Sequence, residues 1–275
     1  MGNPIDTGKK IIDVAATVMN MSADTPELKE AGENVSQTAL TISKAINNCL
    51  LPIAVVNFAF DKGRKYFEEQ FQQDLENVTT DIPEENIIEP KASLAAPVLQ
   101  GLAFSHEELP LKEMYLNLLK STMDSRNNNI AHPAFAKVIE QLTAEEAKEL
   151  KPIMEEKNST PIIKIVRELE NGSTSSLVNH IYDYRDSNTG MAVEFPALSA
   201  MVDNWVRLGL INVTYSEYLT RENAYDWADN RPEYLRFLKL VGSHHDKNGE
   251  FKFNFKKGIL RQTAFGENFS KAVIN

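Results

Sequence analysis

The feature that most constrains this chain is the helical periodicity of residues 111–150, LKEMYLNLLKSTMDSRNNNIAHPAFAKVIEQLTAEEAKEL. Apolar residues first recur at i, i+3, i+4, i+7 and i+8, as Leu111, Met114, Tyr115, Leu118 and Leu119. This spacing places a wide apolar stripe on one side of a helix, which must be buried against other elements. The polar run DSRNNN ends that helix, and a similar stripe follows it. We expect one core to contain residues of both stripes: Leu118, Leu119, Phe135 and Ile139.

The sequence IAHPAF, in the middle of this stretch, raises the question whether His132 is a catalytic residue. Pro133 suits the first position of a helix, where its missing N–H costs no hydrogen bond, and His132 then stands near the N-cap. No second histidine, cysteine or serine–base pair is spaced around His132 as catalysis would require. We therefore interpret His132 and Pro133 as a structural junction. Downstream, Thr143 and Glu146 fit a capping box, TAEE, that starts another helix.

Composition predicts a soluble globular protein. The 275 residues are 42% hydrophobic and 25% charged, which is ordinary for globular domains and enough for one or two cores. The net charge of −10 argues against a chain-wide nucleic-acid surface, although a local basic patch is compatible with it. Cys49 is the only cysteine, so no internal disulfide can form, and we expect a cytoplasmic protein.

Neither apolar segment near the N-terminus predicts a membrane span. The longer one, CLLPIAVVNFAF at residues 49–60, falls short of the roughly 20 apolar residues that cross a bilayer. A buried helix is the favoured interpretation of this segment, and an interfacial amphipathic segment stays open. The other, in MGNPIDTGKKIIDVAATVMNM, is interrupted by Asp13 and lacks a small-residue cleavage site, so it predicts a short helix rather than a signal peptide.

The local sequence patterns divide the chain into three parts: a weakly ordered segment at 1–35, a helical domain at 36–155 and a helix-plus-hairpin domain at 156–275. In the last part we expect TPIIKIVRELEN to be a helix ended by Gly172, and ALSAMVDNWVRLG to be a helix ended by Gly209. EFKFNFKKG alternates phenylalanines with polar residues, which indicates a half-buried strand. Lys257 and Gly258 are interpreted as a turn or bulge in it.

The order of these elements is typical of winged-helix modules. A helix ends at Gly209, a hairpin follows, and Thr263 caps a last helix that contains Gly266. The expected fold class is therefore mostly α, with an N-terminal helical domain and a C-terminal α+β winged-helix-like module that carries a small antiparallel hairpin.

Basic residues gather at the C-terminus. Residues 241–275 hold six Lys or Arg against three Asp or Glu, so this part is locally cationic. We take four of them as a candidate interaction surface: Lys252, Lys256, Lys257 and Arg261. DNA is a less favoured partner than protein, because the candidate reading helix ALSAMVDNWVRLG offers only Arg207.

Other chemistry-bearing residues give only weak signals. His244, His245 and Asp246 are adjacent in a predicted solvated turn, whereas metal ligands usually come from separated positions. His180 stands three residues before Asp183, which suits a surface pair. No phosphate-binding loop, dinucleotide fingerprint, nucleophile elbow or paired-cysteine zinc spacing occurs. We therefore expect no catalytic residue, no cofactor and no metal, and hence no enzyme.

Several segments together resemble one family. They are CLLPIAVVNFAFDKGRKYFEEQF, IPEENIIEPKASLAAPVLQGLAFS, ELPLKEMYLNLLKSTMDSRNNNIAHPAFAKVIEQLTAEEAKEL, WVRLGLINV and ILRQTAFGENFSKAV. These segments, from about residue 40 to the end, are similar to bacterial abortive-infection alpha (Abi-alpha) proteins. Gln262 stands where we expect a leucine in the terminal LT-x-FG-x-x-F pattern of that family. The resemblance implies an intracellular bacterial protein that resists phage by halting the infected cell. It supplies no catalytic residues and no mechanism.

Three hypotheses of function follow. The leading one is a non-enzymatic interaction or sensor protein of antiphage defence, with a phage or host protein as partner. The second is a winged-helix DNA-binding regulator, which mixing with DNA would reveal. The third is a membrane-active, toxin-like effector that uses residues 49–60, which flotation with liposomes would reveal. A homo-oligomer is compatible with all three.

Overall fold

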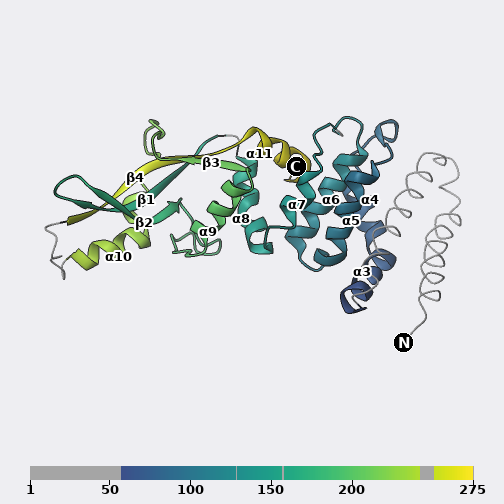
Figure 1. Cartoon of the computed structure of the whole chain (residues 1–275), viewed down its shortest axis with the longest axis horizontal. Helices are drawn as coiled ribbons and strands as arrows, with labels where there is room; N and C mark the ends of the chain where they lie inside the picture. The colour runs from purple at the N-terminus through teal and green to yellow at the C-terminus, as the bar shows by residue number, and fades with distance from the viewer. Residues whose placement is uncertain (1–56, 128, 157, 242–250, 275) are drawn as a thin grey trace, which may run out of the picture. The chain divides into compact units, whose positions relative to one another are not determined.

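The computed structural model describes residues 57–127, 129–156, 158–241 and 251–274 (Figure 1). The chain divides into two compact units, Met1–Pro152 with Asn268–Asn275, and Ile153–Glu267. The sequence placed a boundary after residue 155 and assigned the whole of 156–275 to one domain. In the structure the last residues belong to the first unit instead. The expectations for residues 1–35, Cys49, most of residues 49–60, and the turn of His244, His245 and Asp246 lie outside the described residues.

The first unit is helical. Its described helices are α3 (Asn57–Glu69), α4 (Phe71–Thr79), η3 (Glu84–Asn86), α5 (Ala92–Ser105), α6 (Leu109–Met123), α7 (Ala134–Ile139) and the larger part of α8 (Ala144–Glu155). Helix α6 packs against α4, α5 and α7. The apolar stripes predicted from the sequence are confirmed as core, because all four expected residues are buried: Leu118, Leu119, Phe135 and Ile139.

The C-terminal turns complete this helical core. Helix α11 (Ala264–Phe269) runs into η5 (Ser270–Ile274), which packs against α6. The Phe269 ring meets the Phe135 ring edge-on at 5.3 Å between centroids. The Asn117 amide donates to the Val273 carbonyl at 3.0 Å, and the Ser121 hydroxyl donates to the Ala272 carbonyl at 2.8 Å. Side chains of α6 therefore satisfy carbonyls that a helix end leaves without partners.

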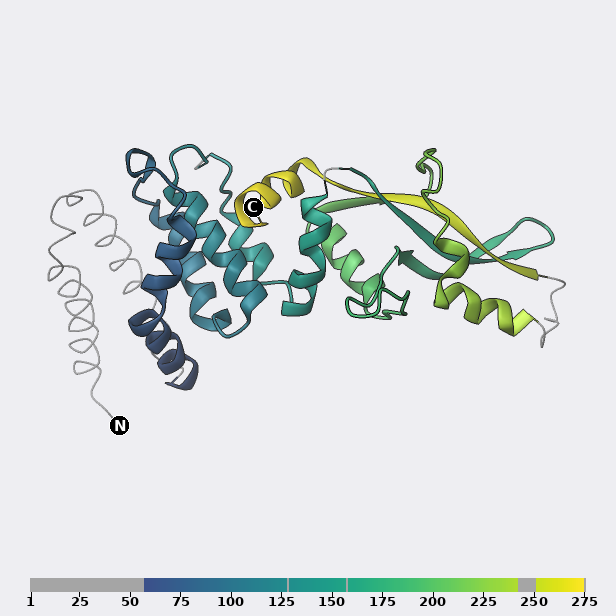
Figure 2. The same ribbon diagram turned by 180° about the vertical axis from the view of Figure 1, so that it is seen from behind.

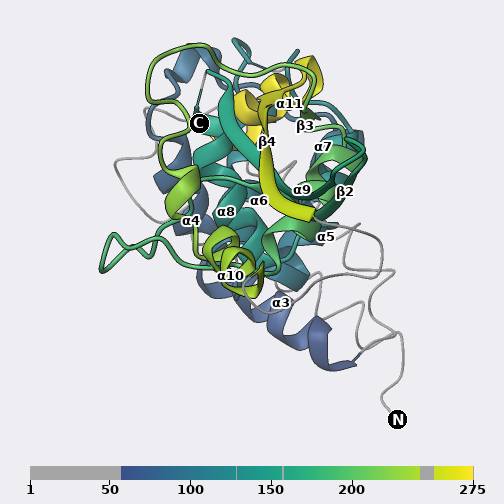
Figure 3. The ribbon, with the colours of Figure 1, turned by 90° about the vertical axis from the view of Figure 1, so that its left-hand side faces the viewer.

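The second unit is built on a four-stranded antiparallel sheet. Its strands are β1 (Thr160–Leu169), β2 (Thr174–Ile181), β3 (Ile211–Thr214) and β4 (Phe251–Gln262), in the order β2-β1-β4-β3. β1 and β4 pair from Thr160↔Leu260 to Leu169↔Phe251 without a register shift. They form a long twisted ribbon, which Figures 2 and 3 show from other sides. α9 (Leu198–Arg207), η4 (Ala228–Asn230) and α10 (Pro232–Val241) complete the unit.

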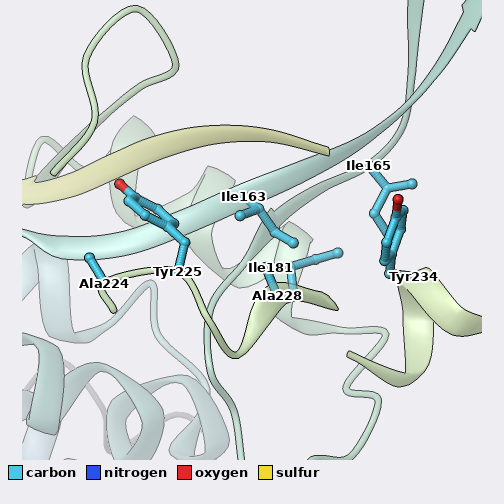
Figure 4. Packing of buried hydrophobic residues seen from close by; sticks show 7 residues of the cluster. All are labelled: Ile163, Ile165, Ile181, Ala224, Tyr225, Ala228 and Tyr234. Atoms are coloured by element: carbon cyan, nitrogen blue, oxygen red, sulfur yellow. The ribbon is translucent and has the colours of Figure 1, made fainter. Parts of the chain in front are cut away.

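One core cluster of this unit packs the sheet against residues 224–234, which lead into the first turn of α10. Figure 4 shows its seven buried residues, which are Ile163, Ile165, Ile181, Ala224, Tyr225, Ala228 and Tyr234. Phe253 and Phe255 of β4 pack against the same cluster. The phenylalanines that alternate in the sequence therefore face this core, as the period-2 pattern predicts.

Two expectations about this unit are wrong. TPIIKIVREL is strand β1 rather than a helix. Its isoleucines and valine are buried on both sides of the sheet, and such a continuous β-branched run favours a strand buried on both faces. The small hairpin expected for a winged helix is replaced by the four-stranded sheet, so the fold is a mixed α/β arrangement that is not clearly of the winged-helix type.

Candidate functional site

Strand β4 distributes the four predicted basic residues over two faces. Its register with β1 is continuous, so successive side chains alternate between the two sides of the sheet. Lys252 and Lys256 consequently share one face, whereas Lys257 and Arg261 lie on the other. The four cations do not form one contiguous surface.

Each of these cations also has a partner in the second unit. Lys252 lies 3.6 Å from Glu168, and Lys256 donates to the Thr174 hydroxyl at 3.1 Å. The Lys257 ammonium lies 5.1 Å from the centre of the Tyr225 ring, and Arg261 pairs with Glu217. Sequence reasoning identified the strand and its lysines, but it missed the partners because they come from other strands and loops.

The predicted junction residues organise helix starts. The backbone N–H of Ala134 donates to Nδ1 of His132 at 3.1 Å, and α7 begins directly after Pro133. In the capping box, the N–H of Thr143 donates to Glu146 at 2.9 Å, and the N–H of Glu146 donates to the Thr143 hydroxyl at 3.1 Å. These contacts satisfy backbone donors that otherwise have no partner at a helix start.

The two predicted glycines shape the junctions of α9 and α11. Gly209 adopts a φ of +74°, and its N–H donates to the Val206 carbonyl while that of Leu210 donates to Trp205. This is a Schellman motif, which favours glycine at that position. At Gly266, an added Cβ would stand 1.9 Å from the carbonyl oxygen of Leu210, the residue before β3, so α11 approaches this backbone more closely than any side chain permits.

The first unit contains a hollow of about 490 Å³ between α5, α6 and α7, which we call the α5–α7 groove. Its apolar lining comes mainly from Pro97, Phe104, Leu111, Ile139 and Leu142. The Phe104 side chain is 51% exposed although its neighbours on α5 are core residues. The volume falls in the range of about 300–1,000 Å³ that is usual for ligand sites, so the groove is the candidate binding site.

Gly101 and Tyr115 set the floor of the groove. A Cβ at Gly101 would lie 2.1 Å from Cζ of Tyr115, so only a glycine lets this ring pass beneath α5. Tyr115 is buried, and its hydroxyl is 3.5 Å from the Ala136 carbonyl. Burial raises the pKa of the Tyr115 phenol, which therefore stays neutral and contributes an apolar face to the groove.

The charged groups of the groove do not balance. Its lining holds Glu108, Lys137 and Glu140. The Lys137 ammonium pairs with Glu140 at 2.5 Å. Within the part of the chain that the structure describes, Glu108 makes no ion pair, so the rim retains an uncompensated negative charge.

A polar cluster in the second unit was not predicted. Two residues of β2, Asn179 and His180, stand opposite a single residue of β1, Lys164. This two-to-one pairing is a β-bulge. His180 has a φ of +59°, which is unusual for a residue with a side chain. Its ring nitrogen Nε2 lies 3.1 Å from Asp203, and Nδ1 lies 3.1 Å from the Tyr215 hydroxyl. The backbone N–H of His180 donates to that same hydroxyl at 3.0 Å.

Electrostatics keep this cluster neutral at the imidazole and the phenol. Burial lowers the pKa of His180, and the nearby Asp203 carboxylate offsets only part of this effect. Burial also raises the pKa of Tyr215 to about 12. The geometry suits a neutral ring that donates from Nε2 to Asp203 and accepts at Nδ1 from Tyr215. The Tyr215 hydroxyl is thus engaged within the protein, and these hydrogen bonds stabilise the conformation of the bulge at His180.

Sequence reasoning paired His180 with the wrong carboxylate. The expected partner one helical turn away, Asp183, instead accepts a hydrogen bond from Arg185 at 2.9 Å. A helical spacing has no meaning on strand β2. The true partners, Asp203 and Tyr215, are 23 and 35 positions away, so no local pattern could have identified them.

The described ranges offer few other sites. They contain no group of three or more His, Cys, Asp or Glu placed to hold a metal ion. None of the helices in these ranges is both long enough and apolar enough to cross a bilayer.

Comparison with known proteins yields one match. The family described as Abortive infection alpha matches residues 63–273, which include both the α5–α7 groove and the whole sheet. No curated protein and no solved structure matches the chain. Since the family match covers most of the 275 residues, this chain belongs to the Abortive infection alpha family.

Proposed function

We propose that this chain is a non-enzymatic interaction protein of antiphage defence in the bacterial cytoplasm, and that its α5–α7 groove binds a partner protein. The observation that carries the proposal is the half-exposed Phe104 beside an apolar hollow within the family-matched residues. A large aromatic side chain on such a rim is typical of protein-binding sites.

The groove suits a helical partner segment. Its apolar lining comes from three helices, and its charged groups lie at Glu108, Lys137 and Glu140. An amphipathic helix that lays its apolar face into a hydrophobic groove is a common mode of peptide recognition. The polar face of such a partner helix would then remain in water. Positively charged groups at its ends would meet the carboxylates of the groove.

The polar contacts of the second unit support an interaction role more than a catalytic one. The Tyr215 hydroxyl, which lies beside His180, is engaged by the ring and the backbone N–H of that histidine. The DNA-binding alternative gains little support from β4, because its cations lie on two faces and are partnered. An extended run of phosphate contacts needs cations on one surface.

The test is phage protection by a bacterial host that expresses the chain. Phe104→Asp should reduce the efficiency of protection at least tenfold, because a carboxylate at the rim opposes an apolar partner. Leu238→Asp is the matched control, since Leu238 on α10 is 42% exposed and lies outside the groove. Both variants should keep the wild-type melting temperature, because both side chains reach solvent.

Two results would contradict the proposal. Full protection by a folded Phe104→Asp variant would show that phage protection does not need the groove. A wild-type chain that protects against no member of a broad phage panel would contradict the assignment to defence.

A further inference from the structure

One face of the ribbon formed by β1 and β4 gathers lysines from both strands. Lys164 of β1 is paired with Lys256 of β4, and Lys252 lies four residues before Lys256 on the same strand. Residues paired across strands share a face, and alternate residues of one strand return to it. Lys164, Lys252 and Lys256 therefore lie on one side of the sheet, which we call the lysine face.

The core does not cover this side of the ribbon. Ile163 and Ile165, the residues on either side of Lys164, belong to the cluster in Figure 4 and point to the opposite side. Within the four strands, all of which the structure describes, the lysine face carries one acidic residue, Glu168. Three cations thus stand against one carboxylate on a chain whose net charge is −10.

Two of these lysines stand directly opposite each other. Like charges in that cross-strand position destabilise a sheet. Lys164 lies 4.6 Å from the centre of the Tyr215 ring, and Lys256 donates to the Thr174 hydroxyl at 3.1 Å. Both of these partners are neutral, and in the described part of the chain neither ammonium pairs with a carboxylate. Two adjacent positive charges therefore remain without a counter-charge.

The lysine face is open to a partner. The Lys252 side chain is 69% exposed, and its ion pair with Glu168, at 3.6 Å, is of the surface kind that contributes little to stability. Asn254 and Lys256 are exposed as well. An anionic group can therefore approach these ammonium groups without displacing any part of the core.

We infer that the lysine face binds an extended, acidic segment of a partner protein. A carboxylate placed between Lys164 and Lys256 would replace their mutual repulsion by attraction. Lys252 and Lys256 are about 13 Å apart along the strand, at about 3.3 Å per residue. An extended segment with an acidic residue at every second position presents carboxylates on one side with the same repeat, so it can meet both lysines.

The same geometry disfavours a nucleic acid. Three cations along such a short stretch of strand contact few phosphates, and the rest of the chain repels a polyanion. Proteins that bind single strands also stack bases on aromatic rings. On this face the Tyr215 ring already carries the Lys164 ammonium.

The inference does not rest on the proposed function of the groove. The lysine face belongs to the second unit, whereas the α5–α7 groove belongs to the first. It adds a second contact, of opposite chemistry, for a protein partner.

The experiment is fluorescence anisotropy with the full-length chain at low salt. The probe is a fluorescein-labelled peptide of alternating glutamate and serine, and the neutral probe has glutamine in place of glutamate. A third probe is a single-stranded DNA with the same number of negative charges as the acidic peptide. The wild type should bind the acidic peptide in the micromolar range, and bind both other probes more weakly.

Matched variants assign the binding to one face. Lys164→Gln with Lys256→Gln should weaken binding of the acidic peptide by at least about tenfold, because it removes the two opposed charges. Lys257→Gln with Arg261→Gln changes the net charge by the same amount on the other face and should change the affinity by less than about twofold. Lys164→Arg with Lys256→Arg keeps both charges and should bind as the wild type does. Melting temperatures show that each variant is folded.

Every result bears on the inference. Loss of peptide binding confined to the Lys164→Gln, Lys256→Gln variant, with binding kept by the arginine pair, supports it. Equal loss in both glutamine variants overturns it, because the attraction would then be a general effect of net charge. Absent binding, or equal binding of the neutral peptide, also overturns it. Tighter binding of the single-stranded DNA would assign the face to nucleic acid instead. Phe104→Asp should leave peptide binding unchanged, so failure at the groove and failure at the lysine face are separable.

Discussion

The ring of Tyr215 lies directly over Gly258 of strand β4. A Cβ at Gly258 would stand 2.5 Å from Cδ1 of Tyr215 and 2.5 Å from the Thr214 carbonyl oxygen. The glycine therefore leaves room for the ring to cross the strand. The Tyr215 hydroxyl can then accept a hydrogen bond from the backbone N–H of His180. Gly258 is paired with Ile162 within the continuous ladder of β1 and β4, so it is neither the turn nor the bulge that the sequence suggested. A glycine inside a strand here marks a close approach.

Gly258→Ala should destabilise the second unit by about 1–3 kcal/mol, because an added methyl group forces a packed ring and a backbone carbonyl to move. Both tryptophans, Trp205 and Trp227, lie in this unit, so denaturant unfolding followed by tryptophan fluorescence reports on it. Asn254→Ala, at an exposed position on the same strand, is the control and should change little. An unchanged midpoint for Gly258→Ala would mean that the ring does not lie across the strand.

The second unit should lose stability on mild acidification because of His180. Burial lowers the pKa of this histidine in the folded protein, so the unfolded chain takes up the proton first as the pH falls. The stabilisation is complete above the unfolded pKa of about 6.5 and declines as the pH falls below it toward the folded pKa. Asn tolerates the left-handed backbone that His180 adopts. His180→Asn should therefore flatten the loss between pH 7 and pH 5, measured by tryptophan fluorescence.

The control for this pH dependence is His132→Asn, which removes an imidazole from the other unit. It should leave the acid-induced loss in the second unit as it is in the wild type. An equally steep loss in His180→Asn would assign the effect to carboxylates instead.

The helical unit could be predicted from the sequence, because its signals are local. The stripes around Leu119 and Ile139 and the capping box at Thr143 each depend on residues within one or two turns. Strand β1 could not be predicted with the same reasoning. Ile162, Ile163, Ile165 and Val166 satisfy a helical spacing as well as a buried strand, and only the ten-residue pairing with β4 decides between them.

The candidate sites show the same limit. The alternation of Phe253 and Phe255 with lysines identified β4, but the division of its cations between two faces depends on a continuous register. The groove was not predicted at all. It forms where Gly101 of one helix admits the Tyr115 ring of the next, and such a contact leaves no periodic trace in the sequence.

Leu119→Ala should destabilise the first unit by about 2–5 kcal/mol, because it removes a fully buried side chain from the helix at the centre of the core. Circular dichroism at 222 nm during thermal unfolding measures the change. Leu109→Ala on the same helix is the matched control, since its side chain is 60% exposed and should cost far less. A wild-type melting temperature for Leu119→Ala would contradict the assigned core.

His132→Asn should leave both folding and phage protection nearly intact. The His132 ring accepts a hydrogen bond from the N–H of Ala134, and an asparagine side-chain oxygen can accept the same bond at a helix start. Melting temperature and plaque counts on one preparation check the two halves of this prediction. Loss of protection by a well-folded variant would reveal chemistry at His132 that the junction does not require.

Random duplex DNA should bind this chain only weakly. Lys256 and Lys257 point to opposite faces of β4, so one duplex cannot contact both through the same surface, and the net charge of −10 repels phosphates. Fluorescence anisotropy at about 50–150 mM salt should show weak binding with a shallow salt dependence, because few phosphate contacts release few counterions. Lys256→Glu with Lys257→Glu should change this little. Sub-micromolar binding that collapses in the double variant would instead favour the DNA-binding alternative. Absent DNA binding, with phage protection lost in the same folded variant, would indicate that a protein partner uses β4 in addition to the groove.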